Sequence, residues 1–155
     1  MSPSKELVNP LAEEGEDASY SSVVEYYQYD PAASGNLVNG NLVCFEDLTA
    51  PATGPVLIKK ATTTPDFRLL GIVVDAPTGG YTPGSSVAVL VEGVGLALFD
   101  ANNTVVNNLG IQSSTTAGTL TNSATATVGK TMCVIMEAVT IASGTALVPV
   151  YVHKM

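Results

Sequence analysis

Few side chains in this sequence have the types and spacing that catalysis needs. The single histidine, His153, lies close to the end of the sequence, where we expect an exposed side chain rather than a general base. No second histidine is present to activate a serine or cysteine nucleophile. We therefore expect that the protein is not an enzyme and has no catalytic residues.

The two cysteines do not have the spacing of a metal site. Cys44 and Cys133 stand in the apolar runs NLVCF and TMCVIM, far apart in the sequence. Structural zinc sites usually contain closely spaced pairs of ligands, and neither cysteine belongs to such a pair. We interpret both as buried, reduced thiols that pack as small hydrophobic side chains, and we expect no metal and no cofactor.

The carboxylates offer the remaining chemistry, in principle as a glycosidase-like pair or a calcium site. The candidates are Glu46, Asp47, Asp75, Glu92 and Asp100. Nothing in the sequence fixes their spacing, and Asp75-Ala-Pro and Asp100-Ala-Asn-Asn are typical of turns in which Asp accepts backbone N–H bonds. Structural roles are favoured for these residues.

Composition narrows the class of protein further. The chain has 155 residues, of which 46% are hydrophobic and only 13% charged, and its net charge is −8. That length is enough for one domain with a core, and the abundance of Thr, Val, Gly and Asn favours strands and turns. The chain lacks the basic stripe that a nucleic acid or an anionic membrane would require. We expect neither as a partner.

The segment Leu69–Asp100 shows the strongest pattern, which predicts a strand, a long turn and a second strand. Val87, Val89 and Val91 alternate with Ala88, Leu90 and Glu92, and the run is bounded by Gly84 and Gly93. Such alternation of β-branched residues between glycines is typical of a strand with at least one buried face.

Similar short runs continue along the chain. Asn39-Gly40 is a strong hairpin signal, although the apolar runs on either side of it are brief. The last run contains Pro149, which favours an edge strand or a bulge. Together these patterns predict an all-β protein, either a small β-barrel or β-tulip or a sandwich-like domain, with an extended N-terminal arm.

The arm is predicted at residues 1–30, followed by the β domain at residues 31–155. Residues 1–30 hold seven acidic side chains against Lys5 alone. They also hold two apolar groups, which are Leu7, Val8 and Leu11, and then Tyr20, Val23, Val24, Tyr26, Tyr27 and Tyr29. The tyrosine group is compatible with two alternatives: a first strand of the β domain, or a segment that orders by adding a strand to a partner.

Several of these residues occur in a pattern that resembles the tailed-bacteriophage capsid decoration (cement) proteins. The pattern is a Gly-Ile strand, a turn at Asp-Ala, a glycine and a V-x-V-x-V-x-G strand. Its residues here are Gly71, Ile72, Asp75, Ala76, Gly84, Val87, Val89, Val91 and Gly93. A closing element at Gly129, Lys130, Met132–Met136, Glu137 and Ala138 is also similar, as is the terminal run Leu147–Val152.

The resemblance implies a structural virion protein without enzymatic activity. Such proteins form homotrimers on the outer surface of the mature bacteriophage head, where they bridge capsomers and stabilise the head against internal DNA pressure. The expected partners are the major capsid protein and neighbouring decoration trimers. We expect Leu7, Val8, Leu11, Tyr20, Val23, Val24, Tyr26, Tyr27 and Tyr29 to form a capsid-binding arm.

Two alternatives remain open at this stage. One is another phage structural protein, such as a tail-tube or fibre-base protein, and the other is a carbohydrate-binding β module. The sequence starting MSPSKELVNPLAEEGEDA lacks the basic and apolar regions of a signal peptide, which predicts synthesis in the host cytoplasm.

Overall fold

The fold, taken from a computed structural model, is all-β. The structure describes residues 22–46, 56–62, 69–100, 104–105, 110–113, 116–123, 133–136, 139–141 and 143–153, with the backbone alone at 104–105, 110–113, 122–123 and 133–135. No helix that could span a membrane occurs in these ranges. The strands are β1 Val23–Tyr29, β2 Leu42–Phe45, β3 Leu57–Lys60, β4 Leu69–Val73, β5 Ser86–Phe99, β6 Thr104–Val105, β7 Gly110–Ser113, β8 Leu120–Ser123, β9 Cys133–Ile135, β10 Val139–Thr140 and β11 Ala146–Val152.

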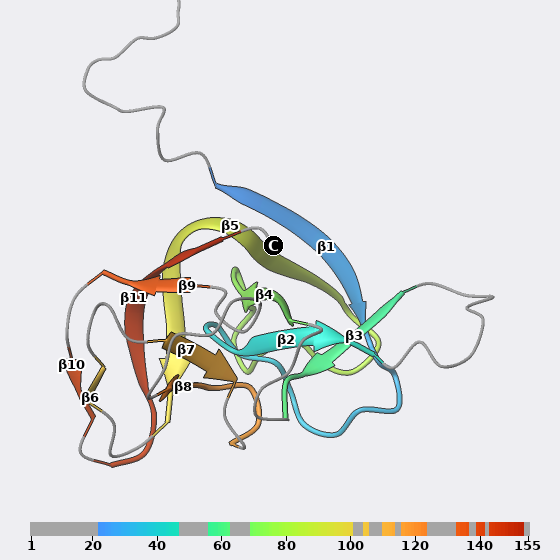
Figure 1. Ribbon diagram of the computed structural model, residues 1–155. Coiled ribbons are helices and arrows are strands. Elements are labelled where there is room, and N and C mark those ends of the chain that lie inside the picture. The colour runs from blue at the N-terminus through green and yellow to red at the C-terminus, as the bar shows by residue number, and fades with distance from the viewer. Residues whose placement is uncertain are drawn as a thin grey trace, which may run out of the picture.

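The first five strands close into a hydrogen-bonded ring in the order β1-β3-β2-β4-β5, with β5 returning to β1 (Figure 1). The pairs are antiparallel except for β1 and β3, which run parallel through Gln28↔Leu57 and Tyr29↔Ile58. The side chains inside the ring form one core, here called the ring core: Tyr29, Leu37, Val43, Ile58, Val73, Val87, Val89 and Val91.

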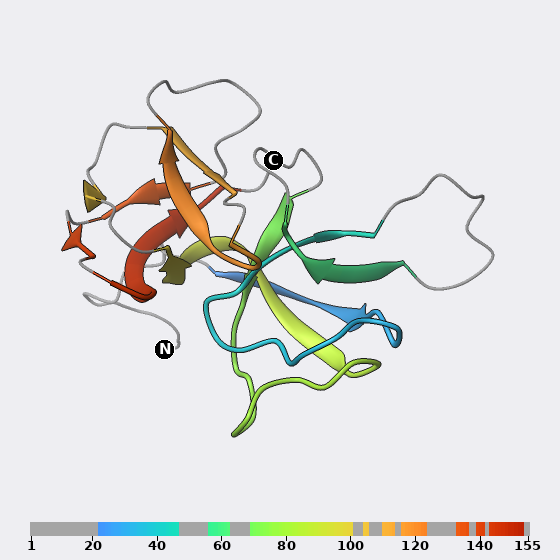
Figure 2. The ribbon, with the colours of Figure 1, turned by 90° about the horizontal axis from the view of Figure 1, so that it is seen from below.

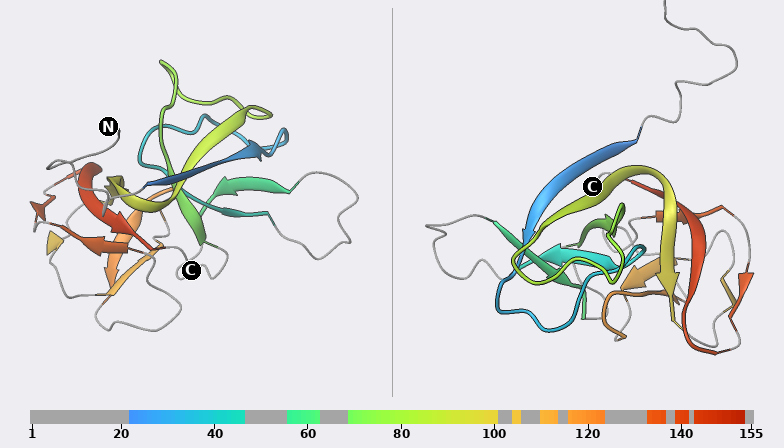
Figure 3. Two further views of the ribbon diagram at one scale, coloured as in Figure 1. Left: turned by 90° about the horizontal axis from the view of Figure 1, so that it is seen from above. Right: turned by 180° about the vertical axis from the view of Figure 1, so that it is seen from behind.

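Strand β5 is shared between the ring and a second group of strands. Its first half pairs with β1 and β4, and its second half pairs with β11, which in turn pairs with β9 (Figure 2). Strand β8 joins β5 at Phe99 and pairs with β7. The two halves of β5 thus belong to differently oriented parts of the sheet, and the strand curves strongly between them (Figure 3).

A second core fills the space between the ring and the second group of strands. From the ring it receives Leu42, Cys44, Ile72 and Leu90, and from the second group Ala97, Phe99, Val148, Val150 and Val152, together with Leu120 and Ile141. The side chains of β2 and β4 therefore alternate between two buried environments, which explains why both strands are apolar throughout.

The alternation of Val87, Val89 and Val91 is confirmed, because all three side chains point into the ring core. Gly93, which bounds the alternating run in the sequence, does not end the strand, since β5 continues to Phe99. Val23 pairs with Glu92 whereas Val24 pairs with Leu90, so β5 contains one extra residue just before the glycine. Such a bulge increases local twist. Gly93 therefore marks a bend in a continuous strand.

Gly93 is suited to this bend for two reasons. Its φ is 122°, a conformation that side chains with a Cβ rarely adopt. A Cβ at this position would also lie 2.9 Å from Ser22 Cα, just before β1 begins. The bend brings the start of β1 directly onto the backbone of β5.

The turn at Asn39-Gly40 is present, but the expected hairpin is not. Leu37 forms a bridge with Tyr81, whereas Leu42 pairs with Ile72. The two sides of the turn therefore pair with different segments of the chain. The apolar side chains of β2 explain this pairing, because they are buried in both cores when β3 and β4 flank the strand.

Pro149 does not lie on an edge strand, since β11 runs between β5 and β9. The proline is tolerated because it lies at the end of the β9 pairing. Its carbonyl accepts a hydrogen bond of 3.1 Å from the N–H of Met136, and the register with β9 begins only at the next residue, Val150.

Candidate interaction surface

In the described part of the chain, the candidate histidine, cysteine and carboxylate side chains do not come together as a catalytic or metal site. No group of three or more His, Cys, Asp or Glu side chains lies close enough there to hold a metal ion. His153 is exposed and contacts the ring of Tyr151 edge-on, with centroids 5.3 Å apart. Cys44 is fully buried in the second core, while the side chain of Cys133 lies outside the described residues.

Two of the candidate carboxylates have structural settings. Asp75 occupies a turn with a φ of 54°. Its main-chain carbonyl, not its carboxylate, accepts a 2.9 Å hydrogen bond from the Tyr81 hydroxyl. Glu46 forms an ion pair of 3.3 Å with Lys59. Asp47 lies outside the described residues.

The tyrosine group predicted for the arm is divided by the structure. Leu7, Val8, Leu11 and Tyr20 lie outside the described residues, whereas Val23–Tyr29 forms β1 and closes the ring. For this segment the first-strand alternative is the one that the structure shows. The folded unit thus includes seven residues from the stretch expected as an arm.

The side chain of Tyr29 lies in the ring core, and that of Tyr27 packs against it. Tyr29 is 1% exposed, and its hydroxyl donates to the carbonyl of Gly35 at 2.9 Å. Tyr27 packs against the ring core and meets the ring of Phe45 edge-on at 5.7 Å. Its hydroxyl donates to a carboxylate oxygen of Glu25 at 2.6 Å. Burial, together with this hydrogen bond and the nearby negative charge, raises the pKa of Tyr27 to about 12.

Val24 and Tyr26 lie on the opposite side of β1. They are 37% and 69% exposed, although they pair with the buried residues Leu90 and Ala88 of β5. The outside of the ring is therefore covered over β5 but open over β1. An exposed tyrosine next to an exposed valine is a suitable anchor for a protein partner, since Tyr provides a large contact area and a polar hydroxyl.

The edge of β1 adds hydrogen-bonding capacity to this surface. Pairing with β3 involves only Gln28 and Tyr29, so among the described residues no strand flanks Val23–Tyr27 on that side. An extended edge of this kind accepts an added strand through main-chain hydrogen bonds. We call this edge, with Val24 and Tyr26, the β1 surface. Figure 3 shows the course of β1, in blue, beside β5.

A second apolar surface was not predicted from the sequence. The side chains of β5 beyond Gly93 and of β11 alternate between the second core and the outside, and Val94, Leu96 and Leu147 are 40%, 49% and 46% exposed. The runs VGLALF and ALVPVYV contain no charged residue on either face, so both faces look buried in the sequence. Only the pairing of the strands reveals which face is covered.

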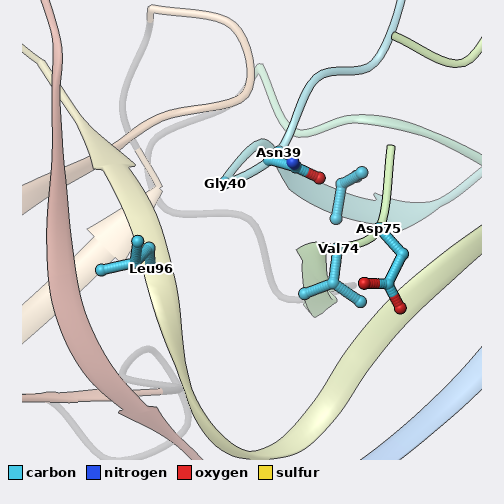
Figure 4. Close-up of a pocket in the computed structure, with 6 residues that line it drawn as sticks. Asn39, Gly40, Val74, Asp75 and Leu96 are labelled. Atoms are coloured by element: carbon cyan, nitrogen blue, oxygen red, sulfur yellow. The ribbon is translucent and has the colours of Figure 1, made fainter. Parts of the chain in front are cut away.

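A hollow of about 230 Å³ lies beside this second surface. It is bounded by the Asn39-Gly40 turn, by Val73, Val74 and Asp75 at the end of β4, and by Leu96 of β5 (Figure 4). The Asn39 side chain is held by the N–H of Ala76, which donates to its Oδ1 at 2.8 Å. The lining is mainly apolar and suits a hydrophobic side chain better than a charged ligand.

Comparison with known proteins finds no protein-family model and no curated protein sequence that matches this chain. The assignment of a function therefore depends on the residues and on the two surfaces described above.

Proposed function

We propose that this protein is a structural virion protein that binds the outer surface of a mature bacteriophage capsid. In this proposal it acts as a homotrimer that bridges neighbouring capsomers and stabilises the head against the pressure of packaged DNA. Its partners are the major capsid protein and adjacent decoration trimers, and no enzymatic step is involved.

The observation that carries the proposal is the β1 surface. Tyr26 is 69% exposed on a strand whose edge has no neighbouring strand from Val23 to Tyr27 in the described part of the chain. β1 directly follows residues 1–21, which contain the apolar group of Leu7, Val8 and Leu11. The sequence thus carries an apolar group in the segment that leads into the open strand edge, a combination that suits a protein that adds a strand to a partner.

The sequence pattern Gly71 to Gly93 supports the same proposal, since it resembles the core of capsid decoration proteins. The described residues also lack a cluster suited to metal chemistry and leave adhesion as the best supported role. In a trimer, three β1 surfaces engage one shell. Linked contacts of this kind increase avidity by about 10²–10⁴ over a single contact.

The proposal is tested by occupancy of purified, expanded, DNA-free shells of the phage that encodes the chain, prepared without this protein. The variant Tyr26→Ser removes the exposed ring, and Val56→Thr changes another exposed apolar residue, 43% exposed, as the matched control. We expect Tyr26→Ser to weaken binding at least about 30-fold, as loss of a central aromatic anchor does, and the control to bind normally. Both should unfold at the wild-type temperature because neither side chain is buried.

A deletion of residues 1–20 tests the contribution of the N-terminal segment separately. The truncated protein should remain folded, since β1 begins at Val23, and its occupancy on shells should fall sharply. If the wild-type protein does not bind the shells at all, the proposal is wrong. Hexamers or stacked rings seen by electron microscopy would instead favour a tail-tube protein.

A further inference from the structure

The outward side chains of β5 beyond Gly93 and of β11 form one continuous apolar face. The antiparallel register places Val94 opposite Tyr151, Leu96 opposite Pro149, and Leu98 opposite Leu147. Residues that oppose each other in an antiparallel pair point to the same side of the sheet. We call this set the outer face: Val94, Leu96, Leu98, Leu147, Pro149 and Tyr151.

The other side of these strands is already used. Ala97, Phe99, Val148 and Val150 are fully buried in the second core. On the outer face, by contrast, Val94, Leu96 and Leu147 remain 40%, 49% and 46% exposed, although this face is as apolar as the buried one. Met136 extends the apolar character next to Pro149 and is 50% exposed.

We propose that the outer face is the central contact between copies of this chain. This proposal deepens the proposed function, because the trimer expected there needs a subunit interface. It identifies β5 and β11 as the strands that provide it. Subunit interfaces have apolar centres depleted in charge, and the outer face has this composition.

The absence of charge on this face favours a second copy over other occupants. None of the six side chains is charged at neutral pH, whereas the whole chain carries a net charge of −8. Two copies can therefore meet at this face without bringing their negative charges into direct contact. A basic partner would find no carboxylate to pair with on the face.

The N-terminal segment of the chain fits this face less well. Residues 1–21 contain five acidic residues and only Lys5 as a basic one, and the outer face offers these carboxylates no cation. Burying an unpaired carboxylate against an apolar surface is costly. Neighbouring copies that turn their outer faces towards a common three-fold axis bring no carboxylate into the contact.

The dimensions indicate that the outer face is the centre of a larger contact. Five residues of strand extend about 17 Å, and adjacent strands are about 5 Å apart. A stable interface buries about 800 Å² on each partner, so flanking segments must complete it. The hollow beside Leu96, with a volume of about 230 Å³, can receive a hydrophobic side chain of the neighbouring copy.

The test is the mass of the full chain by sedimentation velocity from about 0.1 to 100 µM protomer. The variant carries Val94→Thr and Leu96→Thr, which keep strand propensity but make the face polar. The matched control is Val56→Thr, an exposed valine outside the outer face. We expect a trimer for the wild type and the control, and a shift of the dissociation midpoint to at least about 30-fold higher concentration for the double variant.

Circular dichroism of the dissociated variant checks that it is still folded, which we expect because Val94 and Leu96 are 40% and 49% exposed. A wild-type monomer at every concentration would overturn the inference, and so would a double variant that associates like the wild type. Association that appears only after deletion of residues 1–20 would also overturn it, because the segment itself would then cover the face. Shell binding by Tyr26→Ser is measured separately, so the proposed capsid role can fail or hold independently.

Discussion

The close approach of the paired strands β4 and β5 at Gly71 leads to a quantitative prediction about this glycine. This residue lies in β4 opposite Val43, and the next residue, Ile72, pairs with Leu90 of β5. A Cβ on Gly71 would run into the carbonyl oxygen of Leu90 and would lie 2.9 Å from Val89 Cγ1. Gly71 has no positive φ, so the cost of an alanine here comes from contact alone.

The magnitude for Gly71→Ala follows from what has to move. The nearest obstacle is backbone, which cannot rotate away, so β4 and β5 must separate where their ladder helps to close the ring. Overpacking of a filled core costs about 1–3 kcal/mol, and a backbone obstacle favours the upper end of that range. Alanine also lowers the conformational entropy of the unfolded chain, which stabilises the folded state by about 0.4–1 kcal/mol. We expect a net loss of about 2–3 kcal/mol.

The matched control is Gly79→Ala. Gly79 has a φ of +86° but no atom within 4 Å of an added Cβ, so it isolates the backbone strain. That strain costs about 1–2 kcal/mol, and the same gain in the unfolded chain of about 0.4–1 kcal/mol leaves a net cost of about 0–1.6 kcal/mol. Comparing the two variants separates close contact from conformational strain.

The assay is urea unfolding at one fixed protomer concentration, because association changes apparent stability. The midpoints should fall in the order wild type, Gly79→Ala, Gly71→Ala, with similar slopes. By thermal unfolding, Gly71→Ala should melt about 5–10 °C below the wild type, at roughly 2–4 °C for each kcal/mol. A Gly71→Ala protein as stable as Gly79→Ala would refute the close contact of β4 and β5 at Gly71.

Three further predictions concern polar groups. The pKa of Tyr27 is raised to about 12, so the stabilisation from its protonated hydroxyl is complete below pH 10 and is lost as the pH rises towards 12. The variant Tyr27→Phe should remove this part of the pH dependence of the unfolding free energy, measured at alkaline pH. Asn41→Ala should cost about 1–3 kcal/mol in urea unfolding, because the Asn41 side chain is 4% exposed and accepts a 2.8 Å bond from the Val38 N–H. Lys59→Met should change the unfolding free energy by less than about 1 kcal/mol, since its ion pair with Glu46 is partly solvated.

The candidate surfaces were only partly predictable from the sequence. The cluster of tyrosines in residues 20–29 drew attention to the segment that became β1, yet it did not indicate which rings would be buried. Tyr29 is 1% exposed and Tyr26 is 69% exposed, three residues apart on a strand whose two faces have different neighbours. Alternation separates the faces, but the partner strands decide which face is covered.

The outer face could not have been found in this way at all. Leu96 lies in a run without charged residues, which is the pattern of a strand buried on both sides. One side of β5 is buried there and the other is half exposed, because no further layer of the described chain covers it. The local sequence of a strand does not tell whether another layer of the protein packs on its second face.

The sequence by itself determined the class of the fold and the positions of the strands with the clearest alternation of apolar residues. Alternating valines at Val87, Val89 and Val91 specify an extended strand, since β-branched side chains two residues apart share one face. Tertiary structure decided the rest: β1 closes the ring by parallel pairing with β3, and β5 bends at Gly93 to enter a second group of strands. These features depend on contacts between residues far apart in the chain, whose energies do not appear in any local pattern.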